Sequence, residues 1–221
     1  MRLDLHIHTF YSRDAVNTID DIIKFARLRG IDGIAITDHN RIDAALKYSK
    51  TIDEILVIPG IEVDTRYGHI ILLNVHKEPP KTDNLDILKE FAEDENGIMV
   101  LAHPYASLFT KRKNVETIIH KVHAVEVANA SDFKVDTNFR KLLDLAKRYN
   151  IGITAGSDSH IPDTIGYAYI EVESKEVDEI IRDIINRRCK IYYKSVSINL
   201  RMKKIFYDIL HRARLYRPSP P

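Results

Sequence analysis

The sequence predicts an α/β barrel built mainly from parallel strands. Short runs rich in valine, isoleucine and leucine alternate with amphipathic, helix-like segments, a pattern typical of parallel sheets that are buried on both faces. At least five of these runs end in imidazole or carboxylate side chains. In α/β barrels, residues at the carboxyl ends of the strands converge on one face. An open, doubly wound sheet would draw on few strands at its switch point, so the barrel is favoured.

The first half of the chain begins with a strand within residues 3–9. Thr18 or Asn17 is expected to cap a helix whose apolar face starts at Ile19 and which ends at Gly30. Apolar runs then predict strands at 31–37, 55–62 and 69–75, with a short helix at 42–50. Because only a short turn at Tyr67–Gly68 separates the last two strands, we expect a connection tighter than a helix.

The second half continues the alternation. A helix over 84–95 is expected to end before Gly97, which is a typical helix stop signal. The long amphipathic helix 135–149 lies between two strand-like runs and completes a strand–helix–strand unit. The elements expected in this half are strands at 98–102, 124–128, 151–155 and 166–172, and helices at 84–95, 115–122, 135–149, 176–188 and 199–216.

Composition sets the class of protein. The 221 residues, 44% of them apolar, are expected to form one domain spanning 1–221. Cys189 is the only cysteine, which excludes an intramolecular disulfide and fits a reducing compartment. The first residues run directly into a strand pattern, so we expect no leader, and no apolar run reaches about 18 residues. We therefore expect a soluble, cytoplasmic protein with no membrane partner.

The C-terminal segment is strongly basic although the whole chain has a net charge of only +1. From Cys189 onward, eight lysines and arginines face one aspartate. Such a segment could follow a nucleic-acid backbone. The favoured alternative is a helix that closes the barrel with an apolar stripe and leaves its basic side in water. That stripe consists of Ile198, Met202, Ile205, Ile209 and Leu210.

Histidines and carboxylates at the strand ends suggest a metal site. Residues two apart in a strand share a face, so His6 and His8 could reach one ion. Imidazole and carboxylate without thiolate suit zinc, iron or manganese, and the set is too rich in nitrogen for calcium or magnesium alone. Four further runs end in such residues, namely Asp38–His39, Glu62, His103 and the segment from Asp158 to His160.

These motifs, in this order, resemble those of the PHP family, the polymerase and histidinol phosphatase superfamily. The resemblance covers roughly residues 3 to 170. It implies a distorted (βα)7 TIM-like barrel with two or three divalent transition-metal ions at the C-terminal face, and in catalytic members phosphoester hydrolysis. Carried over position by position, the implied ligands are His6, His8, Asp14, His39, Glu62, His103, Asp158 and His160.

The resemblance also implies a ninth histidine shortly after the glutamate, and the chain offers His69 and His76. In an unbroken strand, residues seven apart point to opposite faces and lie roughly 23 Å apart, so both cannot serve one compact site. We choose His69, because a short turn after Glu62 would bring the two strand ends together. His76 instead leads into what looks like a loop at residues 77–80.

The ligand set predicts the chemistry. We expect Glu62 to bridge two ions roughly 3.5–4 Å apart, which would hold a bridging hydroxide and clamp the phosphate oxygens. No protein nucleophile is then required, in agreement with the absence of a Gly-x-Ser-x-Gly elbow. The chain also lacks a Walker-type loop and a Gly-x-Gly-x-x-Gly motif, so nucleotide-powered or dinucleotide chemistry has no support.

Three further residues are candidates for the site. Asp38 precedes the ligand His39 and could orient an imidazole or protonate a leaving oxygen. Asn129 resembles an asparagine found near the substrate in many relatives, and its alternative role is to cap a turn. Arg13 could contact a substrate phosphate, although most surface arginines do not.

The predicted function is metal-dependent hydrolysis of a phosphoester, with a small phosphomonoester or nucleotide favoured over a long polymer. One alternative is an exonuclease that acts on nucleic-acid ends and is guided by the basic C-terminus. The other is a non-catalytic, metal-stabilised barrel that binds RNA or a protein. The number of intact ligands counts against this last alternative, since a scaffold does not need nine of them.

Overall fold

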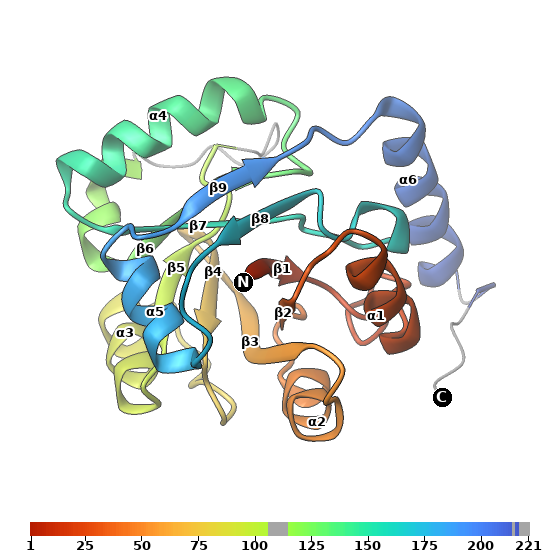
Figure 1. Ribbon diagram of the computed structural model, residues 1–221, viewed down its shortest axis with the longest axis horizontal. Helices are drawn as coiled ribbons and strands as arrows, with labels where there is room; N and C mark the ends of the chain where they lie inside the picture. The colour runs from red at the N-terminus through yellow and green to blue at the C-terminus, as the bar shows by residue number, and fades with distance from the viewer. Residues whose placement is uncertain (106–114, 214, 217–221) are drawn as a thin grey trace.

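The computed structural model describes residues 1–105, 115–213 and 215–216. In this part of the chain nine strands form one sheet that curls into a nearly closed barrel with helices around it (Figure 1). The strands are β1 (Arg2–Ile7), β2 (Gly33–Ile36), β3 (Leu56–Thr65), β4 (Gly68–Leu73), β5 (Ile98–Leu101), β6 (Ala124–Asn129), β7 (Gly152–Gly156), β8 (Ala168–Glu171) and β9 (Lys190–Tyr193). The α-helices are α1 (Ile19–Leu28), α2 (Asp43–Thr51), α3 (Leu85–Asp94), α4 (Val135–Arg148), α5 (Val177–Ile185) and α6 (Ile198–Arg212).

Seven strands make the barrel, and six of them are parallel. β1, β2 and β3 pair in parallel, as do β5, β6 and β7. β4 runs antiparallel between β3 and β5, because the two residues that connect it to β3 reverse the chain, whereas a parallel return needs a long crossover. The ring closes where Ile7 bridges Ser159 just beyond β7. The predicted α/β barrel is thus confirmed, with β4 as its one reversed strand.

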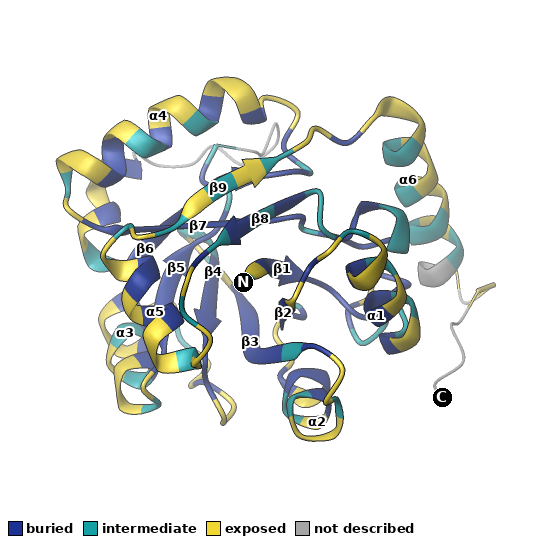
Figure 2. Ribbon diagram, viewed as in Figure 1, coloured by how far each residue is buried: buried dark blue, intermediate teal, exposed yellow. Residues whose placement is uncertain are grey.

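β8 and β9 lie outside this ring. β8 pairs antiparallel with β1 only at Arg2 and Leu3, so it occupies the end of the barrel opposite to the Ile7–Ser159 closure. β9 pairs with β8 and is largely exposed, as Figure 2 shows. β9 is absent from the predicted strands, because a four-residue strand with exposed lysine and tyrosine has no continuous apolar run.

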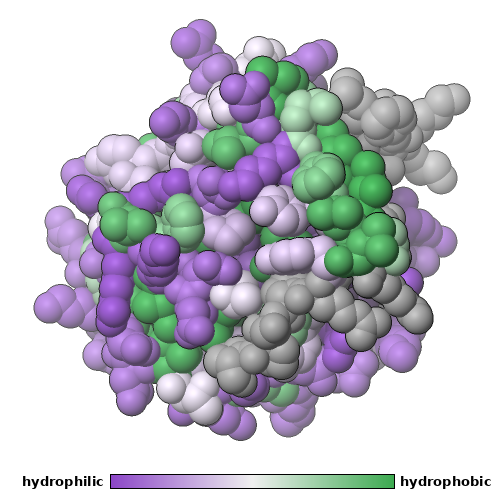
Figure 3. Space-filling view, turned by 90° about the vertical axis from the view of Figure 1, so that its right-hand side faces the viewer, coloured by the Kyte–Doolittle hydropathy of each residue, from purple (hydrophilic) through white to green (hydrophobic). Residues whose placement is uncertain are grey.

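Two expected helices differ from the prediction. The segment near 115–122 forms two short 3-10 turns, Val115–Thr117 and Ile119–Lys121, instead of an α-helix. The apolar stripe of α6 does not close the barrel, since the ring is already completed by β1 and β7. Ile198, Met202, Ile205 and Ile209 are more than half exposed. Figure 3 views the molecule from the side on which α6 lies, and hydrophobic residues gather there in a band.

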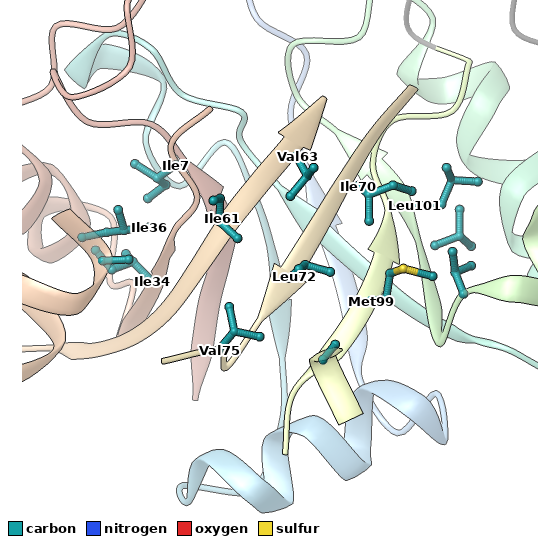
Figure 4. Packing of buried hydrophobic residues seen from close by; sticks show 14 of the residues in the cluster. Ile7, Ile34, Ile36, Ile61, Val63, Ile70, Leu72, Val75, Met99 and Leu101 are labelled. Atoms are coloured by element: carbon teal, nitrogen blue, oxygen red, sulfur yellow. The ribbon is translucent and has the colours of Figure 1, made fainter. Parts of the chain in front are cut away.

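Side chains alternate between the two faces of β3 and β4, and this alternation determines that Glu62 and His69 share one face. Ile61 and Val63 belong to the large cluster that packs the strands against the helices (Figure 4). Glu62 lies between them and therefore points to the opposite face. In the β3–β4 register Glu62 is paired with Ile71, which places His69 diagonally across from Glu62 on the same face. A tight hairpin thus brings these two side chains together.

None of the helices in the described residues combines the length and the apolar character that crossing a membrane requires.

Candidate metal centre

All nine predicted ligands meet at the carboxyl ends of the barrel strands. Contacts of 3.7 Å or less between ring nitrogens and carboxylate oxygens connect them into one network. The members are His6, His8, Asp14, His39, Glu62, His69, His103, Asp158 and His160. They come from β1, β3, β4 and the segments that follow β1, β2, β5 and β7, so residues separated by most of the chain form one cluster.

Glu62 lies at the centre of the cluster and is fully buried. Its Oε1 is 2.9 Å from Nδ1 of His69 and 3.1 Å from Nε2 of His103. Its Oε2 is 3.1 Å from Nδ1 of His39 and 3.3 Å from Nε2 of His8. One carboxylate whose two oxygens face separate groups of imidazoles has the geometry of a bridging ligand.

Several buried polar atoms of the cluster lack a hydrogen-bond partner among the described residues. They are Oδ1 of Asp14, Nδ1 of His39, Oε2 of Glu62 and Nδ1 of His69. Leaving such a group unsatisfied costs roughly 1–3 kcal/mol, so four of them in one place require an explanation. Lone pairs that converge on an ion provide it, and the residues present therefore fit bound divalent metal.

Possible coordination groups can be read from the distances. Three ligand atoms within 4.8 Å of one another are offered by His6–Glu62–His103, by His6–His8–Asp158, by His8–His39–His160 and by His39–Asp64–His69. The last group includes Asp64, which is not among the ligands predicted from the sequence. Asp64 is two residues after Glu62 and so shares its face of β3. The same i, i+2 rule that identified His6 and His8 would have identified it.

The charges in the cluster shift each other's protonation. Burial would raise the pKa of Glu62, but the charge of His6 and the neighbouring ring nitrogens of His103 and His69 hold that pKa well below its usual value. Burial, together with the charges of His160 and His39, lowers the pKa of His8 far below its usual value. Glu62 is thus ionised and His8 neutral near pH 7, which are the forms that bind metal.

Glu126, which is not among the residues predicted from the sequence, holds two of the clustered histidines in place. This buried carboxylate lies 3.0 Å from Nδ1 of His6 through Oε1, while its Oε2 accepts a hydrogen bond of 2.9 Å from the backbone N–H of His103. A carboxylate on one ring nitrogen of a histidine fixes the tautomer and presents the other nitrogen to a metal. The signal in the sequence was a glutamate inside the apolar run of residues 124–128.

Asp38 acts on the imidazoles through neighbouring hydroxyl groups. It is buried, and it accepts hydrogen bonds from the backbone N–H and hydroxyl of Thr9 and from the hydroxyl of Ser12. The Ser12 oxygen lies 3.3 Å from Nδ1 of His8 and accepts a hydrogen bond from the backbone N–H of His39. Burial raises the pKa of Asp38 to about 6. These contacts support the orienting role considered for Asp38 more than the acid role.

Asn129 and Arg13, the two predicted substrate contacts, have different surroundings. Asn129 is buried, donates to Oε2 of Glu126 and accepts from the backbone N–H of Ser131, which supports its role at the turn. Arg13 is exposed and lines a cavity of about 660 Å³. His39 and His69 line the same cavity, so Arg13 can face a molecule that reaches the cluster.

The backbone is unusual at two of the predicted ligands. His103 has φ = 26° and Asp158 has φ = 52°. Residues other than glycine rarely adopt this left-handed region, and each such conformation costs on the order of 1–3 kcal/mol. Strain of this kind persists where the fold holds a side chain in a required position.

His76 lies elsewhere. It follows the end of β4, its side chain is 52% exposed, and Nδ1 is 4.0 Å from Oε2 of Glu95. The structure therefore places His69 beside Glu62 and keeps His76 outside the cluster, as expected for two histidines at opposite ends of one strand.

Comparison with known proteins gives the family. The sequence model of the PHP domain matches residues 4–198. A protein of Caldicellulosiruptor saccharolyticus named probable phosphatase is 28% identical over 212 residues, covering 81% of this chain and 87% of that protein.

Two solved structures share the fold at low sequence identity. One is a two-domain protein from Bacteroides vulgatus that contains a predicted PHP-like metal-dependent phosphoesterase, with a TM-score of 0.68, 18% identity and coverage of 94% of this chain and 69% of that one. Another is a lesion-specific endonuclease from Pyrococcus furiosus, with a TM-score of 0.60, 16% identity and coverage of 100% and 74%. With the PHP sequence model matching most of its length, the chain belongs to the PHP domain family.

Proposed function

We propose that this protein is a metal-dependent phosphoesterase that hydrolyses a small phosphorylated substrate, either a phosphomonoester or a nucleotide. The observation that carries the proposal is the central, fully buried Glu62 with an oxygen that has no hydrogen-bond partner among the described residues, surrounded by five histidines. Membership of the PHP family and a relative named probable phosphatase support a hydrolase.

The nine clustered residues would hold two or three divalent transition-metal ions, either zinc, manganese or iron. Bound ions of this kind lower the pKa of a coordinated water molecule to about 7 and neutralise charge on a phosphate. Glu62 would bridge two ions, and each group of three ligand atoms within 4.8 Å marks a candidate position for one of them. Glu126 and Ser12 orient His6 and His8, so that the ring nitrogens facing Glu62 carry the lone pairs.

The cavity beside the cluster favours a small substrate. Its volume of about 660 Å³ lies within the 300–1,000 Å³ range typical of small-molecule sites. Arg13 supplies a guanidinium that would pair with a phosphate oxygen. Arg41 lines the same cavity, and its guanidinium carbon lies 5.4 Å from the centre of the Tyr11 ring. Two cationic side chains next to the predicted metal ligands suit a charged organic phosphate.

Metal analysis combined with a phosphatase screen tests this proposal. Protein purified without chelators should contain at least two transition-metal ions per chain, and it should release inorganic phosphate from one class among sugar phosphates, histidinol phosphate and nucleotides. Chelation should abolish the release, and manganese, zinc or iron should restore it. Sub-stoichiometric metal together with no rescue by any of the three metals would reject the proposal.

A nucleic-acid end is the second candidate substrate, because the C-terminal segment is basic. Two of its basic residues are already used within the protein: Arg201 donates to the carbonyl of Asp132, and Lys203 pairs with Asp163. The side chains of Arg212, Arg214 and Arg217 lie outside the described residues. Binding of a labelled oligonucleotide at low salt, lost when the chain is shortened after Ser197 so that β9 is kept, would favour this candidate. No binding by the intact chain would exclude it.

A further inference from the structure

The outer face of α6 carries a concentration of exposed apolar side chains. Among the described residues twelve large hydrophobic side chains are exposed, and seven of these belong to α6 or to the residues just after it. Figure 3 views the molecule from this side. Contiguous apolar patches on a protein surface mark interaction sites. Five of the seven side chains lie in the helix itself and are 51–67% exposed: Ile198, Met202, Ile205, Phe206 and Ile209.

Two basic residues hold this helix against the rest of the protein. The guanidinium of Arg201 donates to the backbone carbonyls of Val196 at 3.0 Å and Asp132 at 3.2 Å. Nζ of Lys203 lies 2.7 Å from Oδ2 of Asp163. The helix therefore presents its apolar face outward in a fixed orientation. A face that is already ordered loses little conformational entropy when a partner binds.

The spacing of the exposed residues indicates the kind of partner. Four of them follow one another in steps of four, three and four: Ile198, Met202, Ile205 and Ile209. Such steps form the narrow a/d stripe of a helix that pairs with another helix. A helix on a lipid surface instead keeps its lysines and arginines free for lipid head groups. Because Arg201 and Lys203 are bound within the protein, a second helix is favoured over a lipid surface.

A second copy of this chain offers such a helix, and the stripe is complementary to itself. In a two-fold dimer, residue i of one subunit contacts residue j of the other while j contacts i. Two antiparallel α6 helices, with the axis midway between Met202 and Ile205, set Met202 of each copy opposite Ile205 of the other. The same axis sets Ile198 of each copy opposite Ile209 of the other. Every residue of the stripe thus has an apolar partner.

The charges beside the stripe agree with the antiparallel orientation. Arg201 and Asp208, the only acidic residue of α6, are seven residues apart and so lie along the same edge of the stripe. Around the two-fold axis Arg201 of each copy falls next to Asp208 of the other, whereas a parallel pair would set Arg201 against Phe206. Among the described residues the guanidinium of Arg201 donates to backbone carbonyls and not to a carboxylate. Its charge can therefore serve an acid of the second copy.

We propose that α6 is the interface of a homodimer, in which the apolar stripes of two copies pack antiparallel around a two-fold axis. The inference goes beyond the proposed phosphoesterase function and does not depend on it. The 15-residue helix offers a stripe roughly 22 Å long. Phe133 is 62% exposed and lies 3.9 Å from the Arg201 guanidinium, so it extends the apolar surface beyond the helix. This extension brings the contact toward the roughly 800 Å² per partner of a stable interface.

Analytical ultracentrifugation over a range of concentrations tests the proposal. The wild-type chain should sediment as a dimer that dissociates on dilution. Ile205→Glu should raise the dimer Kd on the order of a hundredfold or more, because the two-fold axis places both carboxylates in the contact. Met202→Glu should act in the same way. Leu28→Glu is the matched control, since Leu28 is 71% exposed on α1, and this variant should dimerise like the wild type.

Disulfide cross-linking tests the orientation of the two helices. In a Cys189→Ala background, Met202→Cys and Ile205→Cys chains are mixed in equal amounts under oxidising conditions. The antiparallel pair should form disulfides preferentially between the two variants, because Met202 of one copy faces Ile205 of the other. A preference for disulfides within each variant would indicate a parallel pair and would overturn the proposed arrangement.

The remaining outcomes separate the dimer from other partners. Ile205→Glu should keep the circular dichroism spectrum and thermal midpoint of a folded monomer, since this side chain is already half exposed in the single chain. A wild type that stays monomeric at every concentration would overturn the proposal, and so would a dimer that both glutamate variants leave intact. Co-sedimentation with vesicles of phosphatidylserine and phosphatidylcholine tests the lipid alternative. Vesicle binding by a monomer, lost in Ile205→Glu, would assign the face to a lipid surface and overturn the homodimer.

Discussion

Asp4 and Glu62 are both fully buried carboxylates in barrel strands, yet their surroundings are opposite. Asp4 accepts hydrogen bonds from the backbone N–H groups of Ser157 at 2.8 Å and Gly166 at 2.7 Å, so both of its oxygens are satisfied by the fold. Glu62 faces imidazoles, and one of its oxygens has no hydrogen-bond partner among the described residues. Burial raises the pKa of Asp4 to about 6, whereas the histidines hold that of Glu62 well below normal.

Asp4 and Glu62 show how a buried carboxylate with a structural role differs from one with a functional role. A carboxylate whose acceptors are filled by backbone N–H groups ties strands together and needs nothing further. A carboxylate that is buried with an unfilled oxygen is stable only with an external partner. Four substitutions test this distinction, because each removes or neutralises a polar side chain in one of the two environments.

The largest effect is expected for Glu62→Ala. Removing the central ligand should eliminate at least one metal ion. Loss of a residue that only hydrogen-bonds a metal ligand typically lowers activity roughly 10–100-fold, and we expect phosphatase activity to fall by more than that. The fold should survive, because the buried apolar faces of β3 are unchanged. Metal analysis, circular dichroism and the phosphatase assay measure these three quantities. Full activity in this variant would show that Glu62 is not a ligand.

The next largest effect is expected for His69→Ala, with His76→Ala as its matched control. Nδ1 of His69 lies 2.9 Å from Glu62, while His76 lies near Glu95 outside the cluster. Metal content and affinity in a titration should fall for His69→Ala and stay at the wild-type level for His76→Ala. The reverse pattern would move the ninth ligand to the far end of β4.

A smaller effect is expected for Glu126→Gln, which keeps the size of the side chain but weakens its hold on His6. Metal affinity or activity should fall by roughly 10–100-fold, and excess metal should restore part of the activity. Glu90→Gln on the exposed side of α3 is the control and should behave like the wild type. Equal metal affinity in both variants would contradict the supporting role of Glu126.

The smallest effect on the metal centre is expected for Asp4→Asn. The amide would set an NH2 group against a backbone N–H, so the free energy of unfolding should fall by about 1–3 kcal/mol while metal content stays the same. The folded pKa of Asp4, about 6, lies above its ordinary 3.8, so the ionised group opposes folding increasingly as the pH rises between these values.

Denaturant titrations at several pH values check this sign. The asparagine does not ionise, so the stability difference between wild type and Asp4→Asn should be larger at pH 4 than at pH 7. A variant with normal stability and lost metal would place Asp4 among the functional carboxylates and break the comparison.

The sequence predicted the site residues whose position at the end of a strand is visible in the local pattern. Polar side chains that end apolar runs, such as His6 and His8, are visible locally, and the barrel rule brings such ends together. The tight connection between β3 and β4 could be expected from the short Tyr67–Gly68 turn. The orientation of Glu62 and His69 follows from the period of two along each strand.

Other features could not be read from the chain. The partner of a buried carboxylate depends on which strands become neighbours, so the contact between Glu126 and His6, 120 positions apart, has no local signal. The exposed apolar stripe of α6 has the periodicity of a buried face, and periodicity does not reveal whether another element covers it. The four-residue β9 pairs with the edge of β8, and a strand that depends on such a neighbour has no local signal in the sequence.

The closure between β1 and β7 links metal binding to the order of folding. Gly156 passes so close to His6 that a Cβ at this position would lie 2.3 Å from the Cβ of His6, and the N–H of Asp158 donates to the carbonyl of His6. These contacts join segments about 150 residues apart, and bringing such distant segments together carries one of the larger loop-closure costs in folding. Since Asp158 and His160 reach His8 only through this closure, we expect the last step of folding to create the metal site, so that metal uptake by a refolding chain reports the completion of the barrel.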